Sequence, residues 1–191
     1  MNSPSLRILT WLMLLSTMIG GDALAAENAP ADLSASLAVS TANAAERGDL
    51  PMADRLVVRK SERKLYLYRR GRLLSVYPVR LGLRPEGKKE FEGDFRTPEG
   101  HYSLGKRNPR SDYFLSIQVT YPNPDDITRA HKQGAEPGGA IMIHGLPNSP
   151  RKPVDYYNRV DWTDGCIAVS NSDMVEIWLA TTPGTPIDIV P

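Results

Sequence analysis

The sequence predicts a mainly β domain, a β-sandwich or barrel-like sheet with a few short helices. Three observations indicate this fold class: short segments rich in β-branched and aromatic residues, turn residues between these segments, and few helical periodicities. The chain has 191 residues, of which 41% are hydrophobic and 24% are charged. This composition is that of a globular protein and excludes a wholly disordered or collagen-like chain.

Strands are expected wherever apolar or alternating segments lie between turn residues. The hairpin turn around Gly71 separates two of them, and the Thr97-Pro98 turn opens another at residues 96–102. The remaining expected strands are residues 56–58, 64–68, 73–81, 113–121, 140–143 and 186–190.

Two helices and two long loops complete the expected elements. Residues 125–133 predict a short helix capped by Asp125. Residues 170–182 predict the clearest helix, with Ser170 or Asn171 as its cap and Pro183-Gly184 as its stop. The polar segments 82–95 and 146–164 are expected to be loops.

The first 25 residues have the pattern of a secretory signal peptide. Arg7 precedes an apolar run that ends at Gly20, and Ala23-Leu24-Ala25 gives an A-x-A cleavage pattern. A membrane span needs about 20 apolar residues, and this run is shorter and interrupted by polar residues. We therefore expect cleavage after Ala25, rather than a retained anchor or a buried helix, and an exported protein that is periplasmic in a bacterium.

The remainder divides into a linker and one domain. Residues 26–52 are rich in Ala, Ser and Asn and have too few large apolar groups to form a core, so we expect a flexible linker. Residues 53–191 form a domain of ordinary size, which we expect to be monomeric.

The charge of this domain is unevenly distributed, although the whole chain carries only +1. Residues 55–110 hold 16 basic and 6 acidic residues, whereas residues 111–191 hold 5 basic and 10 acidic ones. The near-neutral total argues against a nucleic-acid partner. The basic region could attract an anionic polymer or a membrane surface, or it could simply be a solvated strand face.

Cys166 is the only cysteine, which excludes an intrachain disulfide and a multi-cysteine metal cluster. In an exported protein, a lone thiol is either buried as a small apolar side chain or used as a nucleophile. The preceding Gly165 permits a sharp turn that can present backbone N–H groups to a developing oxyanion. The residues alone leave both interpretations open.

A nucleophilic thiol needs a base, because a free thiol has a pKa near 8.5. His144 follows a buried strand and precedes Gly145, a position that would fix its imidazole. The other histidines, His101 and His131, are expected in a turn and on an exposed helix. A zinc protein using these groups is an alternative, but no zinc-type ligand spacing is present, so we expect neither a metal nor another cofactor.

The order Ile143-His144-Gly145, a loop and Thr163-Asp164-Gly165-Cys166-Ile167 resembles the active-site signature of the L,D-transpeptidase catalytic domain family. The stretch from Thr97 to Tyr102 resembles a second conserved segment of that family. The chain departs from the pattern at Asp164, where the family usually has His, and at Ala168, where it often has Arg or Asn. The resemblance covers about residues 54–190 and implies a β-sandwich-like fold.

The resemblance also implies roles for individual residues. Cys166 would attack a peptide carbonyl, His144 would be the base, and the Gly145 carbonyl would orient its imidazole. The N–H groups of Gly165 and Cys166 would form the oxyanion hole. The residues that would contact substrate are Asp164, Thr163 and Tyr121, although loop capping is an alternative for Asp164 and core packing for Tyr121.

The implied substrates are peptidoglycan stem peptides, with an anchored lipoprotein as a further acceptor or substrate. The implied reaction is acyl transfer through a cysteine thioester, which an amine resolves. Two alternatives remain: a hydrolase on the same fold, in which water resolves the thioester, and a non-catalytic wall-binding module that uses the basic region.

Overall fold

The computed structural model describes residues 51–191. The expected signal peptide, its cleavage site and all but the last two residues of the expected linker lie outside the described residues, so these expectations stay predictions. Among the residues that are described, no helix combines the length and the apolar character that crossing a membrane requires.

An eight-stranded sheet dominates the fold, with the order β3-β2-β1-β8-β4-β5-β6-β7. Most neighbouring strands are antiparallel, but β1 pairs with β8 and β6 pairs with β7 in parallel. The strands are β1 (Arg55–Arg59), β2 (Lys64–Arg69), β3 (Arg72–Pro78), β4 (Gly100–Ser111), β5 (Phe114–Val119), β6 (Met142–His144), β7 (Ile167–Ala168) and β8 (Pro186–Val190).

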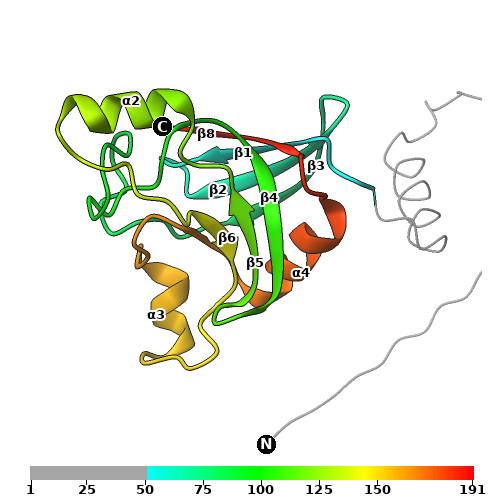
Figure 1. Cartoon of the computed structure of the whole chain (residues 1–191). Coiled ribbons are helices and arrows are strands. Elements are labelled where there is room, and N and C mark those ends of the chain that lie inside the picture. The colour runs from blue at the N-terminus through cyan, green and yellow to red at the C-terminus, as the bar shows by residue number, and fades with distance from the viewer. Residues whose placement is uncertain (1–50) are drawn as a thin grey trace, which may run out of the picture. The chain divides into compact units, whose positions relative to one another are not determined.

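The two ends of this strand order meet. Arg80, just beyond β3, exchanges two backbone hydrogen bonds of 2.8 Å with Ala168 in β7. The sheet therefore curves back on itself, with β1, β2 and β3 on one side and β4, β5 and β6 on the other (Figure 1). This arrangement confirms the predicted mainly β, sandwich- or barrel-like fold with few short helices.

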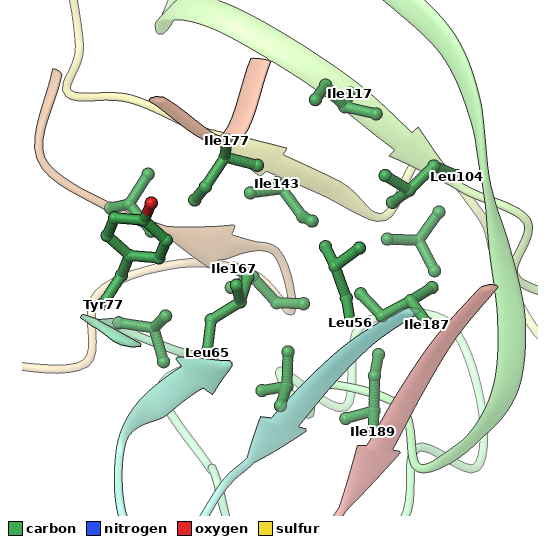
Figure 2. Packing of buried hydrophobic residues seen from close by; sticks show 14 of the residues in the cluster. Leu56, Leu65, Tyr77, Leu104, Ile117, Ile143, Ile167, Ile177, Ile187 and Ile189 are labelled. Atoms are coloured by element: carbon green, nitrogen blue, oxygen red, sulfur yellow. The ribbon is translucent and has the colours of Figure 1, made fainter. Parts of the chain in front are cut away.

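The core lies between the two parts of the sheet. Leu56 and Leu65 from the first part face Ile143 and Ile167 from the second, and Ile177 from a helix joins them (Figure 2). All five are fully buried. Burying a large aliphatic side chain contributes about 1.5–3 kcal/mol, so this cluster ties β1 and β2 to the strands that carry the candidate site.

Three helices are described: α2 (Pro124–Lys132), α3 (Val154–Arg159) and α4 (Asn171–Ala180). The cap of α2 is Asn123 and not Asp125, so that prediction was wrong. Asn123 and Asp126 form a reciprocal capping box, and Pro124 fits the first turn because it needs no N–H partner there.

The predicted loop 146–164 contains α3, which the sequence analysis missed. Its N-cap is Pro153, and no side chain caps it, so the sequence lacks the usual start signal. The prediction for α4 was more accurate: Ser170 is the cap and accepts a hydrogen bond from Asp173 N, while Met174 and Ile177 point into the core.

Two buried lysines hold the loop 82–97 in place. Lys60 Nζ donates to the carbonyl oxygens of Gly87 and Thr97 and pairs with Glu99 at 2.8 Å. Lys89 pairs with Asp94 at 2.6 Å, and both side chains are almost fully buried. These contacts fix the backbone against which the cysteine turn packs.

Candidate functional site

Two short parallel strands bring Cys166 and His144 together. The register pairs Ile143 with Ile167 and His144 with Ala168, so Cys166 lies level with Met142 on the neighbouring strand. Residues two apart on a strand share a face, which places the side chains of Cys166 and His144 on one side of the sheet. Both side chains line the same cavity.

The turn before Cys166 depends on Thr163 and Gly165. Thr163 Oγ1 donates to the carbonyl of Cys166 at 2.7 Å and accepts from the N–H of Gly165 at 3.2 Å. Gly165 has a φ of +131°, and a Cβ at this position would lie 2.7 Å from the carbonyl oxygen of Arg96. Only glycine fits this backbone conformation and this close approach.

This turn changes the expected roles of its amides. Because the Gly165 N–H already donates to Thr163 Oγ1, it is occupied within the turn. Within residues 51–191, the N–H of Cys166 has no hydrogen-bond acceptor. The amide of Cys166 is therefore a free donor beside the sulfur, and Gly165 acts through its conformation.

His144 is 4% exposed, and a hydrogen bond to the neighbouring residue orients its ring. Its Nδ1 lies 2.7 Å from the carbonyl oxygen of Gly145, which requires Nδ1 to carry the proton and leaves Nε2 with a free lone pair. Burial lowers the pKa of His144 to about 4, while the bond to Gly145 opposes this shift. At neutral pH the imidazole is therefore an uncharged base.

The carbonyl of Gly145 is itself held in place. The Gly145 N–H donates to the carbonyl oxygens of Tyr113 and Leu115. A Cβ on Gly145 would lie 2.6 Å from Oδ1 of Asn171, the atom that accepts the N–H of Leu146. The start of α4 thus packs directly on the turn that orients the imidazole.

Two aromatic rings pack against the imidazole. The ring centroids of Tyr113 and Trp162 lie 4.7 and 5.5 Å from that of His144. Tyr157 of α3 in turn packs against Trp162 at 5.0 Å. These rings remove the imidazole from water, which is the physical cause of its low pKa.

The thiol of Cys166 is also neutral in the resting site. Burial raises its pKa, a backbone hydrogen bond with Met142 opposes this shift, and the charge of Asp164 adds to it. The sulfur lies 3.5 Å from the carbonyl oxygen of Ala140, which can accept the thiol proton. The site therefore pairs an uncharged thiol with an uncharged imidazole.

The cavity has a volume of about 390 Å³ and combines polar, charged and aromatic groups. Of the expected site residues, Cys166, His144, Thr163 and Asp164 line it. Gly145 and Gly165 belong to the two adjoining turns. Trp162, from the segment expected as the loop 146–164, also lines the cavity. The lining residues that the sequence analysis did not single out are Asn108, Arg110, Ser111, Asp112, Tyr113, Ser116, Ala140 and Met142.

Tyr121 is an expected substrate contact that the structure places elsewhere. It is 4% exposed, packs edge-on against Tyr102 and donates its hydroxyl to the carbonyl of Pro137 at 2.8 Å. It is a core residue and does not belong to the cavity lining. A buried tyrosine and a site tyrosine have the same sequence pattern here, which is why the sequence left both interpretations open.

Within residues 51–191, no group of three or more His, Cys, Asp or Glu side chains is arranged to hold a metal ion. The chemistry that the cavity can perform with its own groups is acyl transfer: a thiol, a base oriented by a carbonyl, and a free amide donor beside the sulfur.

The fold is that of the L,D-transpeptidase class of catalytic domains. The sequence of residues 53–189 matches the family YkuD, the L,D-transpeptidase catalytic domain, and the chain belongs to this family. It is 34% identical over 129 residues to YafK of Escherichia coli K12, a candidate L,D-transpeptidase, covering 64% of this chain and 45% of YafK. The chain thus spans about half the length of the curated relatives it matches.

Two solved structures are also similar. The helical cell shape determining protein Pgp2 of Campylobacter jejuni is 28% identical with a TM-score of 0.54, over 72% of this chain and 47% of Pgp2. Bd1075 of Bdellovibrio bacteriovorus is 25% identical with a TM-score of 0.52, over 74% of this chain and 51% of Bd1075. Both matches agree with the fold described above.

Proposed function

We propose that the protein transfers acyl groups between peptidoglycan stem peptides through a thioester on Cys166. One observation carries the proposal: Cys166 and His144 line one cavity, and the His144 imidazole is held with Nε2 unprotonated. Membership of the L,D-transpeptidase family supports stem peptides as the substrate class.

The first half of the reaction forms the thioester. Nε2 of His144 takes the thiol proton of Cys166 as the sulfur bonds to the carbonyl carbon at the L-centre of the donor diamino acid. The oxyanion that develops accepts the free N–H of Cys166. The C–N bond then breaks, the His144 proton passes to the leaving nitrogen, and D-alanine departs.

The second half resolves the thioester. An amine of a second stem peptide, or of an anchored lipoprotein, gives a proton to Nε2 of His144 as its nitrogen attacks the thioester carbonyl. The C–S bond breaks, the proton returns to the sulfur, and a new amide is released. Such a protein would be exported and would work in the periplasm, after cleavage of the expected signal peptide at Ala25.

Hydrolysis on the same site is the second candidate, and one observation favours it. Asp112 and Asp164 both line the cavity, and Asp164 is exposed there. Two carboxylates would attract the free ammonium group of a donor peptide. An incoming amine would be attracted only as its protonated ammonium form, which has no lone pair and cannot attack the thioester. Water would then resolve the thioester, and the protein would trim stem peptides or detach a lipoprotein.

A partition measurement separates the two outcomes. A disaccharide-tetrapeptide donor is incubated with the protein and increasing concentrations of an amine acceptor, and mass spectrometry quantifies the cross-linked and free-acid products. We expect the cross-linked product to dominate at high acceptor concentration, because an amine held in the site has a large effective molarity. Free acid as the main product at every acceptor concentration, lipoprotein-type acceptors included, would show hydrolysis instead.

The control for this measurement is Cys166→Ala. The side chain is small and sits in a turn, so the variant is expected to unfold at nearly the same temperature as the parent while losing both products. Covalent addition of the donor acyl group should be seen by mass spectrometry on the parent alone. Normal turnover by Cys166→Ala would contradict both candidate functions, because each needs the thioester.

A further inference from the structure

The outward side of β1, β2 and β3 carries tyrosine and aliphatic side chains that no function described above uses. The register places Tyr66 between Val57 and Val76, and Tyr68 opposite Leu73. The rings of Tyr66 and Tyr68 are stacked, with centroids 6.4 Å apart. Leu73 and Val76 are 47% and 40% exposed, although both are apolar.

The acidic groups on this side of the sheet are matched by cations. Asp188 pairs with Arg55 at 2.6 Å and also contacts His101. Glu62 pairs with Arg59 at 2.9 Å, and the guanidinium of Arg59 lies over the ring of Tyr66. In each pair the positive charge neutralises the negative one. The net charge of this side of the sheet is therefore set by its other basic residues.

The remaining basic residues gather at the β2–β3 hairpin. Lys64, Arg69, Arg70 and Arg72 are all exposed, and in the part of the chain that the structure describes none of their side-chain nitrogens lies within 4 Å of a carboxylate. The carboxylate of Asp54 lies beside the turn, where it accepts the backbone N–H of Arg70 at 2.6 Å. Three of them flank the turn immediately before the exposed Leu73. The hairpin therefore presents an excess of positive charge next to apolar side chains.

We propose that this surface docks on an anionic phospholipid membrane. We call it the basic tyrosine face, formed by Tyr66, Tyr68, Leu73 and Val76 together with Lys64, Arg69, Arg70 and Arg72. Tyrosine rings are favourable at the membrane–water interface, and each basic side chain near an anionic lipid surface adds attraction. The exposed aliphatic groups supply the apolar contact that charge alone does not.

The shape of the face favours a membrane over a single soluble ligand. The groups lie on one face of a sheet and at a hairpin, so they can contact an extended surface at the same time. None of them lines the cavity that holds Cys166, so docking does not use the residues of that cavity. The proposal is independent of whether an amine or water resolves the thioester.

The test measures sedimentation with lipid vesicles, using the protein purified after export and with its N-terminus read by mass spectrometry. Vesicles of phosphatidylcholine are compared with vesicles containing phosphatidylglycerol, and the readout is the excess binding to the anionic vesicles. Subtracting the binding to phosphatidylcholine vesicles removes any contribution of a retained apolar segment, because such a segment would bind both kinds of vesicle. Two variants are compared: the hairpin variant Arg69→Gln/Arg70→Gln/Arg72→Gln, and the control variant Lys106→Gln/Lys132→Gln/Lys152→Gln with the same loss of charge.

We expect the parent and the control variant to bind anionic vesicles and to be released by salt. Removing three basic residues at about 1 kcal/mol each should weaken binding by the hairpin variant about 100-fold. Thermal unfolding shows that both variants are folded, since all six positions are exposed. Equal weakening by the two variants, or no excess binding of the parent to anionic vesicles, would overturn the proposal. The proposal would also be overturned if the parent bound purified peptidoglycan through the hairpin but did not bind vesicles. The partner of this face would then be a wall polymer and not a membrane.

Discussion

Burial makes both reacting groups neutral in the resting site. The aromatic rings beside His144 lower the pKa of its imidazole to about 4, and burial raises the pKa of the Cys166 thiol. An imidazolium–thiolate pair is therefore not the resting state. In the proposed reaction, attack by the sulfur therefore requires transfer of its proton to Nε2 of His144 as the substrate is engaged, which is general-base catalysis.

Alkylation of Cys166 by iodoacetamide should report this resting state. The thiolate is the reacting species, so the rate should stay low near pH 7 and rise with a midpoint above the usual thiol pKa of about 8.5. The rate is followed by mass spectrometry between pH 5 and 10. A midpoint below pH 7, which His144→Gln abolishes, would instead reveal a preformed ion pair.

Replacing Gly165 with alanine should disrupt the cysteine turn. The new Cβ would meet the Arg96 carbonyl oxygen at 2.7 Å, and a φ of +131° is unfavourable for any residue with a Cβ. We expect at least about a 100-fold loss of activity, because a displacement of about 1 Å at a reacting group can cost that much.

Gly71→Ala is the matched control for this prediction. Gly71 also has a positive φ, of +75°, but no atom lies within 4 Å of the position that the added methyl group would take. This substitution should cost about 1–2 kcal/mol of stability and leave the activity unchanged. If both variants retain the parent's kcat, the turn at Gly165 does not determine the position of the sulfur.

At the scale of single elements, the strands were predictable because the alternation in their sequences matches the alternate burial of their side chains in the folded sheet. Lys64–Arg69 alternates buried leucines with partly buried tyrosines, and its sequence shows this alternation directly. The helix α3 was missed because Pro153 provides no side-chain cap and only Tyr157 of its residues is buried. A helix held by one aromatic contact leaves almost no periodic signal.

The candidate site was predictable only where its residues lie in a local motif. Cys166, His144 and their glycines stand in short patterns that can be read from the sequence, and the structure places Cys166 and His144 in one cavity. Arg110 and Tyr113 come from the β4–β5 hairpin, which the tertiary pairing of β5 with β6 brings beside His144. Tyr121 instead packs against Tyr102 in the core, a tertiary contact that its sequence neighbours do not show.

The loop 82–97 gives an element-scale prediction through its buried ion pair. Asp94→Ala leaves the ammonium of Lys89 with the carbonyl of Phe91 as its contact, so the variant should lose about 3–5 kcal/mol in free energy of unfolding. Denaturant unfolding measures this loss. Asp155→Ala, which removes an exposed pair with Arg159, should change stability by less than about 1 kcal/mol. Equal effects of the two substitutions would contradict a structural role for the Lys89 pair.

At the scale of the whole molecule, the candidate site lies where the curved sheet closes. Ala168 in β7 is joined to Arg80 just beyond β3, and it is paired with His144 in β6. Cys166 and His144 are therefore attached to the closing strands, and their geometry depends on the whole sheet remaining folded. Because His144 is buried at this point, its protonation affects the free energy of unfolding of the whole domain.

This coupling predicts how stability depends on pH. In the unfolded chain His144 binds a proton below about pH 6.5, whereas in the folded protein burial delays protonation until the pH approaches 4. Because the unfolded state binds more protons in this window, stability falls as the pH is lowered from 6.5 towards 4. Between pH 6.5 and 5 the loss should be about 2 kcal/mol, at 1.36 kcal/mol for each pH unit.

Denaturant unfolding of the parent and of His144→Gln between pH 7 and 5 isolates this contribution. Asp94 and Asp188 have pKa values lowered from 3.8, so their stabilising contributions are lost at a pH below this window. The difference in unfolding free energy between parent and variant should therefore shrink or reverse as the pH falls, whatever the substitution costs at pH 7. Parallel pH profiles would mean that His144 takes up its proton equally in both states, and the imidazole would then not be the buried neutral base that the proposed reaction requires.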